Sequence, residues 1–409
     1  MNKQIVITGI GVVSSIGIGK EAFWNALFAG KSGIKPVTLF DTSKTRSKLG
    51  GEIRDFEAAS ILGPKGLRNL DRTTLLALCA AKLCLEDAKL TITGEVAGEL
   101  GVVLGSTMGS IKSISDFDLD SIREGPGFVN PAHFPNTVVN SPASQISIRF
   151  CAKKLNATVS NGYTAGLDAM GYAADLIRLG RAEMLLVGGV EELCLQTFLG
   201  LYKIGVLAGS RDSKPELSCP YDKRHNGIIA GEGSAIFLLE TTEHAQRRNA
   251  VPYAEIDGYA NAFDPARRNG YNPKGDGAMQ AMELALSDSG LKAADIDAVS
   301  ASANSTLECD VMETRALKGI FGKKAYALPV SALKSMTGEL LSAQGAVSAA
   351  SGIGCLQKNR LFQTVNYEEK DPRCDLDYVP HGREKRITHL MVNCFGPNGE
   401  NASLVLSKP

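Results

Sequence analysis

Short apolar runs alternate along the whole chain with segments whose apolar residues recur at helical spacing. Such alternation is typical of layered α/β folds, in which helices cover the faces of largely buried sheets. We predict strands at 5–8, 102–104, 157–160, 184–187, 235–239, 254–258, 298–301, 327–330, 389–393 and 403–406. We predict helices at 20–29, 72–88, 166–179, 277–289, 310–321 and 345–358. The pattern therefore constrains the chain to an α/β architecture.

The two halves of the chain repeat the same order of elements. Each half has a central helix, then a buried strand that ends in glycine, then a closing strand. The buried strands read M-L-L-V-G-G and H-L-M-V-N-C-F-G, and the closing strands read S-A-I-F-L-L-E and N-A-S-L-V-L-S. This repetition predicts an internal duplication with its boundary near 250–253, giving an N-terminal half at 1–252 and a C-terminal half at 253–409. The Gly-, Asn- and Pro-containing stretch 267–277 is predicted to be a loop.

The charges are balanced, with 44 Lys and Arg against 44 Asp and Glu. A chain without net charge has no field that attracts nucleic acid or an anionic membrane, so we expect neither partner. The nine cysteines show no C-x-x-C or Cys/His ligand spacing, so we expect reduced thiols and no metal site. The N-terminal apolar run is too short for a secretion signal, and no run approaches the roughly 18 residues that cross a bilayer. We therefore predict a soluble, cytoplasmic protein.

The stretch S-N-G-Y-T-A-G at 160–166 lies between a predicted strand and a predicted helix. Small-residue turns at this position often present a nucleophile in α/β enzymes. Here the presented residue is Tyr163, whose phenol has a reference pKa of about 10, whereas a cysteine thiol starts near about 8.5 and a helix N-terminus lowers it further. Tyr163 is therefore a poor nucleophile at neutral pH.

Longer motifs carry a family resemblance across nearly the whole chain. They are V-I-T-G-I-G-V-V-S-S-I-G at 6–17, F-D-T-S at 40–43, P-Y-D-K-R-H-N-G-I-I-A-G-E-G at 220–233, L-K-S-M-T-G-E-L-L-S-A-Q-G-A-V at 333–347 and C-D-L-D-Y-V-P-H at 374–381. With these motifs the sequence resembles the β-ketoacyl-acyl carrier protein synthases, which are condensing enzymes. The resemblance implies a duplicated thiolase-like fold with layers αβαβα, and it implies no cofactor.

Active members of this family use a nucleophilic cysteine, two histidines, a lysine and a gating phenylalanine. Three of these positions are altered here. Y-T-A-G puts Tyr163 in place of the cysteine, A-S-A-N-S-T puts Ser302 in place of the first histidine, and K-S-M-T-G-E puts Glu339 in place of the second. The lysine and the phenylalanine are retained as Lys334 and Phe395.

The altered positions remove the means of condensation that the family uses. Losing one positioned donor to a developing negative charge typically costs a factor of about 10²–10³ in rate. Here both histidines are replaced, and Glu339 puts an acidic side chain beside a centre where the family forms a carbanion. The tail G-P-N-G-E-N at 396–401 also departs from the G-F-G-G-x-N that the resemblance leads us to expect near the oxyanion and gating loop. We therefore expect no catalytic residues for condensation at these degenerate positions.

A subunit without this chemistry resembles the chain-length factor, or ketosynthase β subunit, of type II polyketide synthases. The run A-G-L-D-A at 165–169 is similar to that subfamily, although Tyr163 stands where the subfamily usually has glutamine. The resemblance implies a heterodimer with an active ketosynthase α subunit, and an acyl carrier protein that bears the growing chain. In this interpretation Tyr163 fills the volume of the acyl thioester and stabilises an emptied cavity.

The segment S-T-M-G-S-I-K-S-I-S-D-F at 106–117 aligns with the pocket and interface region of the family. We predict that its apolar side chains contact the partner's growing chain, and that bulky side chains there shorten the product. These residues are Met108, Ile111, Ile114 and Phe117. An apolar stripe of this kind can equally belong to the core, and that alternative stays open. The run at 130–140 is predicted to form the interface loop that feeds the opposite active site.

Two functions of other classes stay open. One is a ketosynthase-like decarboxylase or acyltransferase with an atypical site, for which Glu339 beside Lys334 is the candidate base. The other is a structural or carrier-binding homodimer without a role in chain length. Asp310 and Glu313 follow the first altered motif, and we expect them to make structural hydrogen bonds.

The histidines and most cysteines fall outside the altered motifs. The histidines, which we predict to be surface or loop residues, are His133, His225, His244, His381 and His389. The cysteines that we interpret as small apolar fillers are Cys151, Cys194, Cys219, Cys309, Cys355 and Cys394.

Overall fold

The computed structural model describes residues 3–211, 214–266 and 270–409. Within these residues most strands join one mixed sheet of 11 strands. Their bounds are β1 Ile5–Ser14, β2 Gly17–Ile18, β5 Leu100–Gly105, β6 Asn156–Val159, β7 Met184–Glu191, β8 Gly233–Thr241, β9 Ala254–Phe263, β10 Ala298–Ser300, β11 Val330–Ser331, β14 His389–Phe395 and β15 Glu400–Ser407. Two small antiparallel pairs lie apart from it, formed by β3 Lys35–Pro36 with β4 Leu49–Gly50 and by β12 Arg360–Leu361 with β13 Arg383–Glu384.

The strand order repeats between the two halves of the chain. In the first half β1 is antiparallel to β8, β8 is antiparallel to β7, and β7, β5 and β6 are parallel. In the second half β9, β15, β14, β10 and β11 follow the same sequence of orientations. The two five-stranded units join through a short antiparallel pairing of β1 with β9, where Val6 faces Glu255 and Ile7 faces Ala254. This repetition supports the division that we propose near residue 252.

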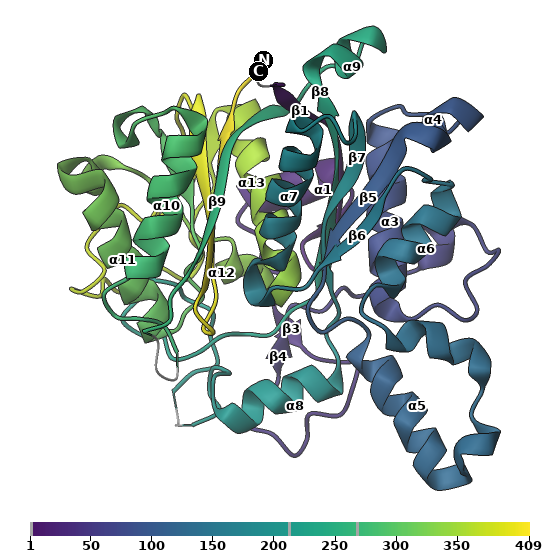
Figure 1. Cartoon of the computed structure of the whole chain (residues 1–409). Coiled ribbons are helices and arrows are strands. Elements are labelled where there is room, and N and C mark those ends of the chain that lie inside the picture. The colour runs from purple at the N-terminus through teal and green to yellow at the C-terminus, as the bar shows by residue number, and fades with distance from the viewer. Residues whose placement is uncertain (1–2, 212–213, 267–269) are drawn as a thin grey trace.

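The main helices cover both units in layers (Figure 1). They are α1 Lys20–Phe28, α3 Arg72–Asp87, α6 Ser141–Phe150, α7 Ala165–Arg178, α10 Asp276–Ser289, α11 Leu307–Phe321 and α13 Gln344–Lys358. α7 and α13 lie between the two units, α3 and α6 cover the outer face of the first, and α10 and α11 cover the outer face of the second. The predicted order of layers, αβαβα, is therefore confirmed.

Three hydrophobic cores fill the spaces between these layers. The central core contains Leu167 of α7 and Val347 of α13. Leu76 of α3 belongs to the core behind the first unit, and Met282 of α10 and Leu317 of α11 belong to the core behind the second. Each of these five side chains is fully buried. Burial of sheets on both faces explains why the predicted strands read as continuous apolar runs.

All of the predicted helices and strands are present, most with ends shifted by one or a few residues. The run 327–330 differs most, because a 3-10 helix, η5 Gly322–Ala327, occupies its start and β11 begins only at Val330. Pro329 has no amide hydrogen to donate to a ladder, which explains the short strand. The predicted loop at 267–277 ends two residues early, at Gly275, because α10 begins at Asp276. Its residues 267–269 lie outside the described residues.

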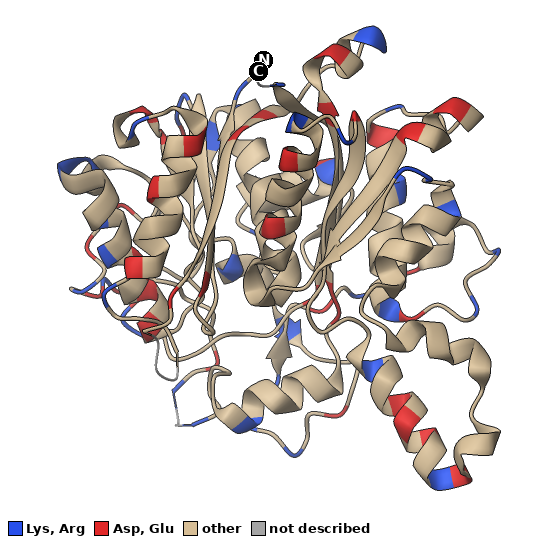
Figure 2. Cartoon of the chain, in the orientation of Figure 1, with Lys and Arg blue, Asp and Glu red and all other residues tan. Residues whose placement is uncertain are grey.

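Shorter helices complete the chain. They are α2 Ala58–Leu62, α4 Gly94–Glu99, α5 Ile111–Glu124, α8 Leu195–Ile204, α9 Thr242–Arg247 and α12 Lys334–Thr337, with the 3-10 turns η1 Pro126–Phe128, η2 Pro131–Thr137, η3 Gly162–Thr164, η4 Ala293–Asp295 and η6 Leu341–Ala343. α5 extends away from the layers at the lower right of Figure 1, and none of its residues is buried. No helix in the described part of the chain is long and apolar enough to cross a membrane. Acidic and basic residues intermix over the face shown in Figure 2.

Candidate functional site

The structure brings the five predicted site residues together. Tyr163 lies in η3, at the start of α7, and Phe395 is the last residue of β14. Ser302 follows β10, the parallel neighbour of β14, so the carboxyl ends of two strands meet there. Lys334 begins α12, and Glu339 follows that helix one residue beyond its C-cap, Gly338. The site is therefore built from strand ends and helix starts, where side chains converge in open α/β folds.

Lys334 and Glu339 form a buried ion pair at the centre of the site. Lys334 Nζ lies 2.8 Å from Glu339 Oε2, and each side chain is 1% exposed. Nζ also donates a hydrogen bond to the Ser302 carbonyl oxygen at 2.7 Å. Burial lowers the pKa of Lys334, but the Glu339 carboxylate more than offsets this and raises the pKa above its usual value. The lysine that the family uses near its histidines is therefore neutralised here by a carboxylate of the same chain.

Within the described part of the chain, polar partners contact only one oxygen of the Glu339 carboxylate. Glu339 Oε2 accepts a hydrogen bond from Asn304 Nδ2 at 3.3 Å in addition to its contact with Lys334. Glu339 Oε1 is buried and has no hydrogen-bond partner among the described residues. Asn304 Nδ2 also contacts the Tyr271 hydroxyl at 3.1 Å. A carboxylate with an unpartnered buried oxygen is costly, so this side of the site calls for a donor such as water.

The backbone of Tyr163 is held by a residue that the motif comparison did not single out. The Tyr163 N–H donates to Glu400 Oε1 at 3.1 Å, and the Tyr163 carbonyl oxygen accepts a hydrogen bond from Cys394 Sγ at 3.3 Å. A Cβ placed on Gly162 or Gly396 would lie only 2.2 or 2.1 Å from Glu400 Oε1. The Glu400 carboxylate therefore occupies the space beside the turn, against two glycines.

The Tyr163 phenol is held in its protonated form. Burial raises its pKa well above the usual range, and the carboxylates of Glu339 and Glu400 raise it further. Burial also raises the pKa of Cys309 and the pKa of Cys394 well above the usual value of a thiol. These two cysteines are the closest in the sequence to the altered motifs. A protonated phenol and protonated thiols are weak nucleophiles. The site has no group among these that is prepared for nucleophilic attack at neutral pH.

The loop that carries Ser302 is fixed by two buried acids, as predicted. Glu313 accepts hydrogen bonds from the N–H groups of Ser302 at 2.9 Å and Ala303 at 2.7 Å. Asp310 accepts from the Asn304 N–H at 3.0 Å and from the Ser305 N–H at 3.2 Å. The structural role expected for both acids is confirmed.

Ser302 itself makes a structural contact. Its Oγ accepts a hydrogen bond from the Phe395 N–H at 2.7 Å, and both side chains are fully buried. The hydroxyl therefore ties the end of β14 to the loop after β10. This use of the hydroxyl does not require a substrate.

His225 lies in a loop, as predicted, and is buried there, where its Nδ1 lies 2.9 Å from Asp310 Oδ2 and its Nε2 lies 3.2 Å from Asp371 Oδ2. Cys151 was expected to be an apolar filler, but it is exposed in a left-handed conformation at the end of α6. The other five cysteines interpreted as fillers are buried.

The predicted pocket residues lie outside the hydrophobic cores. Met108 is 39% exposed, and Ile111, Ile114 and Phe117 are half-buried along the first turns of α5. Just before them, Thr107 Oγ1 donates to the Gly162 carbonyl oxygen at 2.7 Å, so this segment begins beside the turn of Tyr163. The contact places these residues next to the site, and their role toward a chain remains our prediction.

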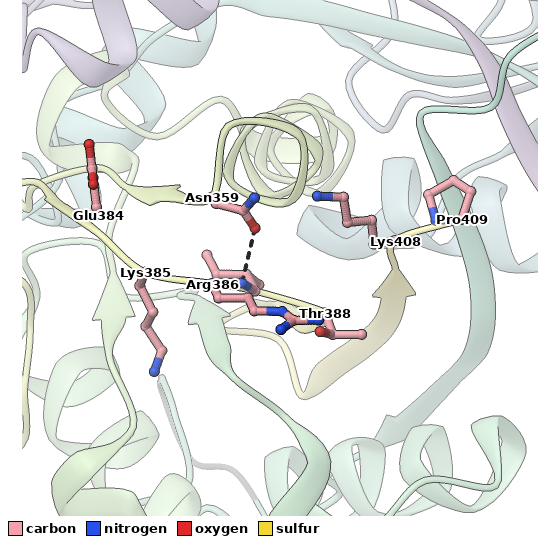
Figure 3. A pocket seen from close by; sticks show the side chains of 8 residues that line it. Asn359, Glu384, Lys385, Arg386, Thr388, Lys408 and Pro409 are labelled. Carbon is pink, nitrogen blue, oxygen red and sulfur yellow. Dashed lines mark hydrogen bonds between the residues drawn. The ribbon is translucent and has the colours of Figure 1, made fainter.

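A separate surface pocket of about 620 Å³ lies beside the C-terminus (Figure 3). It is lined by Asn359, Glu384, Lys385, Arg386, Ile387, Thr388, Lys408 and Pro409. The Asn359 side chain accepts a hydrogen bond there from the Ile387 N–H at 3.3 Å. None of the predicted site residues lines this pocket, so we place the candidate site at Tyr163.

Comparisons with known proteins agree with the fold. A model of the β-ketoacyl synthase N-terminal domain matches residues 2–245, and a model of the C-terminal domain matches residues 253–368. The chain belongs to the β-ketoacyl synthase family. Two relatives, each named 3-oxoacyl-[acyl-carrier-protein] synthase 2, are 36% identical in Coxiella burnetii and 35% identical in Synechocystis sp., both over 408 residues. These alignments cover 99% of this chain and 99% and 98% of the relatives.

Solved structures relate this β-ketoacyl synthase homologue to type II polyketide synthases. It matches "The ishigamide ketosynthase/chain length factor" with a TM-score of 0.93 and 30% identity over the full length of both chains. It matches a chain of "AntDE:AntF", a type II PKS acyl-carrier protein in complex with its ketosynthase, with a TM-score of 0.91 and 28% identity, again over both full lengths. The chain is thus a ketosynthase-like protein with a thiolase-like fold.

Glu400, Asn304 and Tyr271 were missed as site residues. Glu400 stands in the tail whose departure from the family pattern was noticed, and an acidic residue inside a glycine-rich turn was a usable signal. Asn304 lies within the altered A-S-A-N-S-T motif, but its contact with Glu339 depends on folding across 35 residues. Tyr271 gave no signal, because it lies in a loop far from every motif.

Proposed function

We propose that this chain is a catalytically inactive ketosynthase-like subunit, a chain-length factor, that pairs with an active ketosynthase α subunit and shapes its polyketide chain pocket. The observation that carries this proposal is that the Glu400 carboxylate occupies the turn at Tyr163 and binds its backbone N–H. A protonated phenol stands at the nucleophile's position, and the backbone N–H beside it already donates to Glu400 at 3.1 Å. A donor occupied by an internal carboxylate is not free for a substrate oxygen.

The same geometry opposes decarboxylative condensation. The reaction builds negative charge, and losing one donor to such charge typically costs a factor of about 10²–10³ in rate. The Glu339 carboxylate adds a negative group where the family places a histidine, and it uses the charge of Lys334 at 2.8 Å. The combined loss of nucleophile, donor and free cation supports a subunit without condensing activity.

The surface around α5 supports pairing with another subunit. Ile122 is 81% exposed, Phe128 is 78% exposed and Phe134 is 59% exposed. The Phe134 ring lies 6.1 Å from the ring of Phe117, so the predicted interface loop at 130–140 and the predicted pocket segment form one apolar surface. Large exposed apolar patches mark interaction sites in soluble proteins. Two solved relatives carry titles that name a chain length factor and an acyl-carrier protein, which favours the same assembly for this chain.

The proposal is tested by coexpression with an active ketosynthase encoded beside this chain. Native mass spectrometry should show a 1:1 heterodimer for the wild type. Phe128→Asp should weaken pairing at least tenfold, because it puts a charge on the apolar surface. Val251→Asp is the matched control, since Val251 is 83% exposed outside this surface and should leave pairing unchanged. A homodimer that ignores the ketosynthase would instead favour the structural or carrier-binding alternative.

One observation keeps a second function in view. The buried, unpartnered Glu339 Oε1 beside Lys334 is the arrangement that a ketosynthase-like decarboxylase or acyltransferase with an atypical site would need. The test is release of carbon dioxide from a malonyl carrier by the heterodimer after the partner's cysteine has been replaced. Activity that survives this replacement and is lost in Glu339→Gln would support the second function.

A further inference from the structure

Three side chains able to ligate a metal gather on the N-terminal half, away from the candidate site. Glu99 is the last residue of α4, Glu183 directly precedes β7, and His244 lies in α9. One ligand atom of each residue lies within 4.8 Å of those of the other two. In Figure 1, α4 and α9 lie at the upper end near both termini, whereas α12, which carries Lys334, lies well below them. The residues are far apart in the sequence, so no ligand spacing could reveal them.

The ring of His244 is oriented by a buried carboxylate. His244 Nδ1 lies 2.5 Å from Glu240 Oε1, and the Glu240 side chain is fully buried. At this distance the Glu240 carboxylate accepts a hydrogen bond from Nδ1–H, which leaves Nε2 as the nitrogen that faces Glu99. A carboxylate that holds the second nitrogen in this way is the usual support of a metal-ligating histidine.

The distances suit a metal after small movements of exposed side chains. His244 Nε2 lies 4.0 Å from Glu99 Oε2, which is too far for a hydrogen bond. Two ligand atoms on a tetrahedral zinc, each bound at roughly 2.1 Å, lie about 3.4 Å apart. The Glu99 side chain is 49% exposed and the Glu183 side chain is 43% exposed, so rotation of either can close the remaining gap.

Neighbouring cations do not block the cluster. Arg247 lies 2.5 Å from Glu183 Oε2, but its side chain is 59% exposed, and exposed ion pairs contribute little free energy. Arg248 is engaged with Glu240 at 2.8 Å and 3.1 Å, so its charge offsets that buried carboxylate. Glu99 and Glu183 therefore leave negative charge for a cation at the cluster.

We propose that Glu99, Glu183 and His244 bind a divalent transition metal of the zinc class, with water at the remaining coordination position. Imidazole with carboxylate ligands suits zinc and its neighbours, whereas calcium and magnesium prefer oxygen ligands alone. The metal joins the end of α4, the start of β7 and α9, which leads into the connection between the two halves. It acts as a structural clamp, and this inference does not depend on the proposed function.

The test is a calorimetric titration of the full chain with zinc chloride, carried out in a Cys151→Ser background. This background is needed because Cys151 is the one exposed cysteine of the nine, and thiols bind zinc. We expect one zinc per chain and a thermal unfolding midpoint that rises with zinc concentration. His244→Asn and Glu99→Gln should each weaken binding at least tenfold. His381→Asn, which removes an exposed histidine elsewhere, should leave binding unchanged.

Two results would overturn the proposal. The first is the absence of a saturable zinc signal in the Cys151→Ser chain. The second is that His244→Asn and Glu99→Gln both bind zinc as tightly as the Cys151→Ser chain does, which would locate the metal elsewhere. Glu99 is exposed, so Glu99→Gln should fold normally and remain informative if His244→Asn unfolds.

Discussion

Replacing Lys334 by methionine should destabilise the chain by about 3–5 kcal/mol, because the buried Glu339 carboxylate then loses its cation. Both side chains are 1% exposed, so water cannot readily take the place of the ammonium group. Methionine has a similar length, which keeps most of the packing around the former lysine stem. The Ser302 carbonyl oxygen also loses the hydrogen bond that Nζ donates at 2.7 Å. The expected cost is therefore electrostatic and not a packing effect.

The double variant Lys334→Met/Glu339→Leu separates the pair from its parts. Removing both charges should cost no more than about 1 kcal/mol relative to the wild type, because apolar replacements of buried ion pairs are often neutral. The double variant should then be about 3 kcal/mol more stable than Lys334→Met alone. Lys82→Met is the matched control, since Lys82 pairs with Glu86 at 3.0 Å on the surface and should cost about 0.5 kcal/mol.

Equilibrium unfolding in urea at pH 7, followed by circular dichroism, measures all four proteins under the same conditions. A cost for Lys334→Met no larger than that of Lys82→Met would refute the buried ion pair. The double variant also has a functional readout in the heterodimer. It should still support chain synthesis if this subunit lacks chemistry. Loss of product with intact pairing would favour the decarboxylase or acyltransferase alternative.

Three further results are expected. Tyr163→Phe should leave the heterodimer's product unchanged, and product loss on analysis by mass spectrometry would contradict the space-filling role. Burial raises the pKa of Glu191 and of Glu192 to about 7, above the unfolded value near 4.5. Their protonated forms therefore stabilise the fold below pH 4.5, and this contribution is lost as the pH rises to about 7. The urea midpoint of unfolding should fall over that pH range, and it should fall less in Glu192→Gln. An equal fall in the wild type and in Glu192→Gln would refute this. Phe117→Ala should lengthen the product, and an unchanged length would argue against a pocket wall.

The layered fold could be predicted because its signal is local. Strands buried on both faces read as apolar runs, and the helices between the layers keep their apolar spacing, as Leu167 and Val347 illustrate. α5 was not among the predicted helices, although Ile111, Ile114 and Phe117 recur at helical spacing in it. The sequence interpretation used that spacing only for a pocket wall. The helix buries none of its residues in its own chain.

The site could be predicted only as far as motifs reach. Tyr163, Ser302 and Glu339 were found because each alters a recognisable pattern. The hydrogen bond from the Tyr163 N–H to Glu400 was not found. It joins residues 237 apart in the sequence, and it depends on the fold that brings β14 and β15 beside the turn before α7. The burial of His225 was not predicted, for a related reason. Only the fold places two aspartates around its ring and so permits its burial.

The most direct test of the central claim is a condensation assay with the purified chain alone, supplied with acyl and malonyl groups on an acyl carrier protein. The account predicts no β-ketoacyl product from this chain, and product when the active ketosynthase is added. A β-ketoacyl product formed by the chain alone, and abolished in Tyr163→Phe, would contradict it.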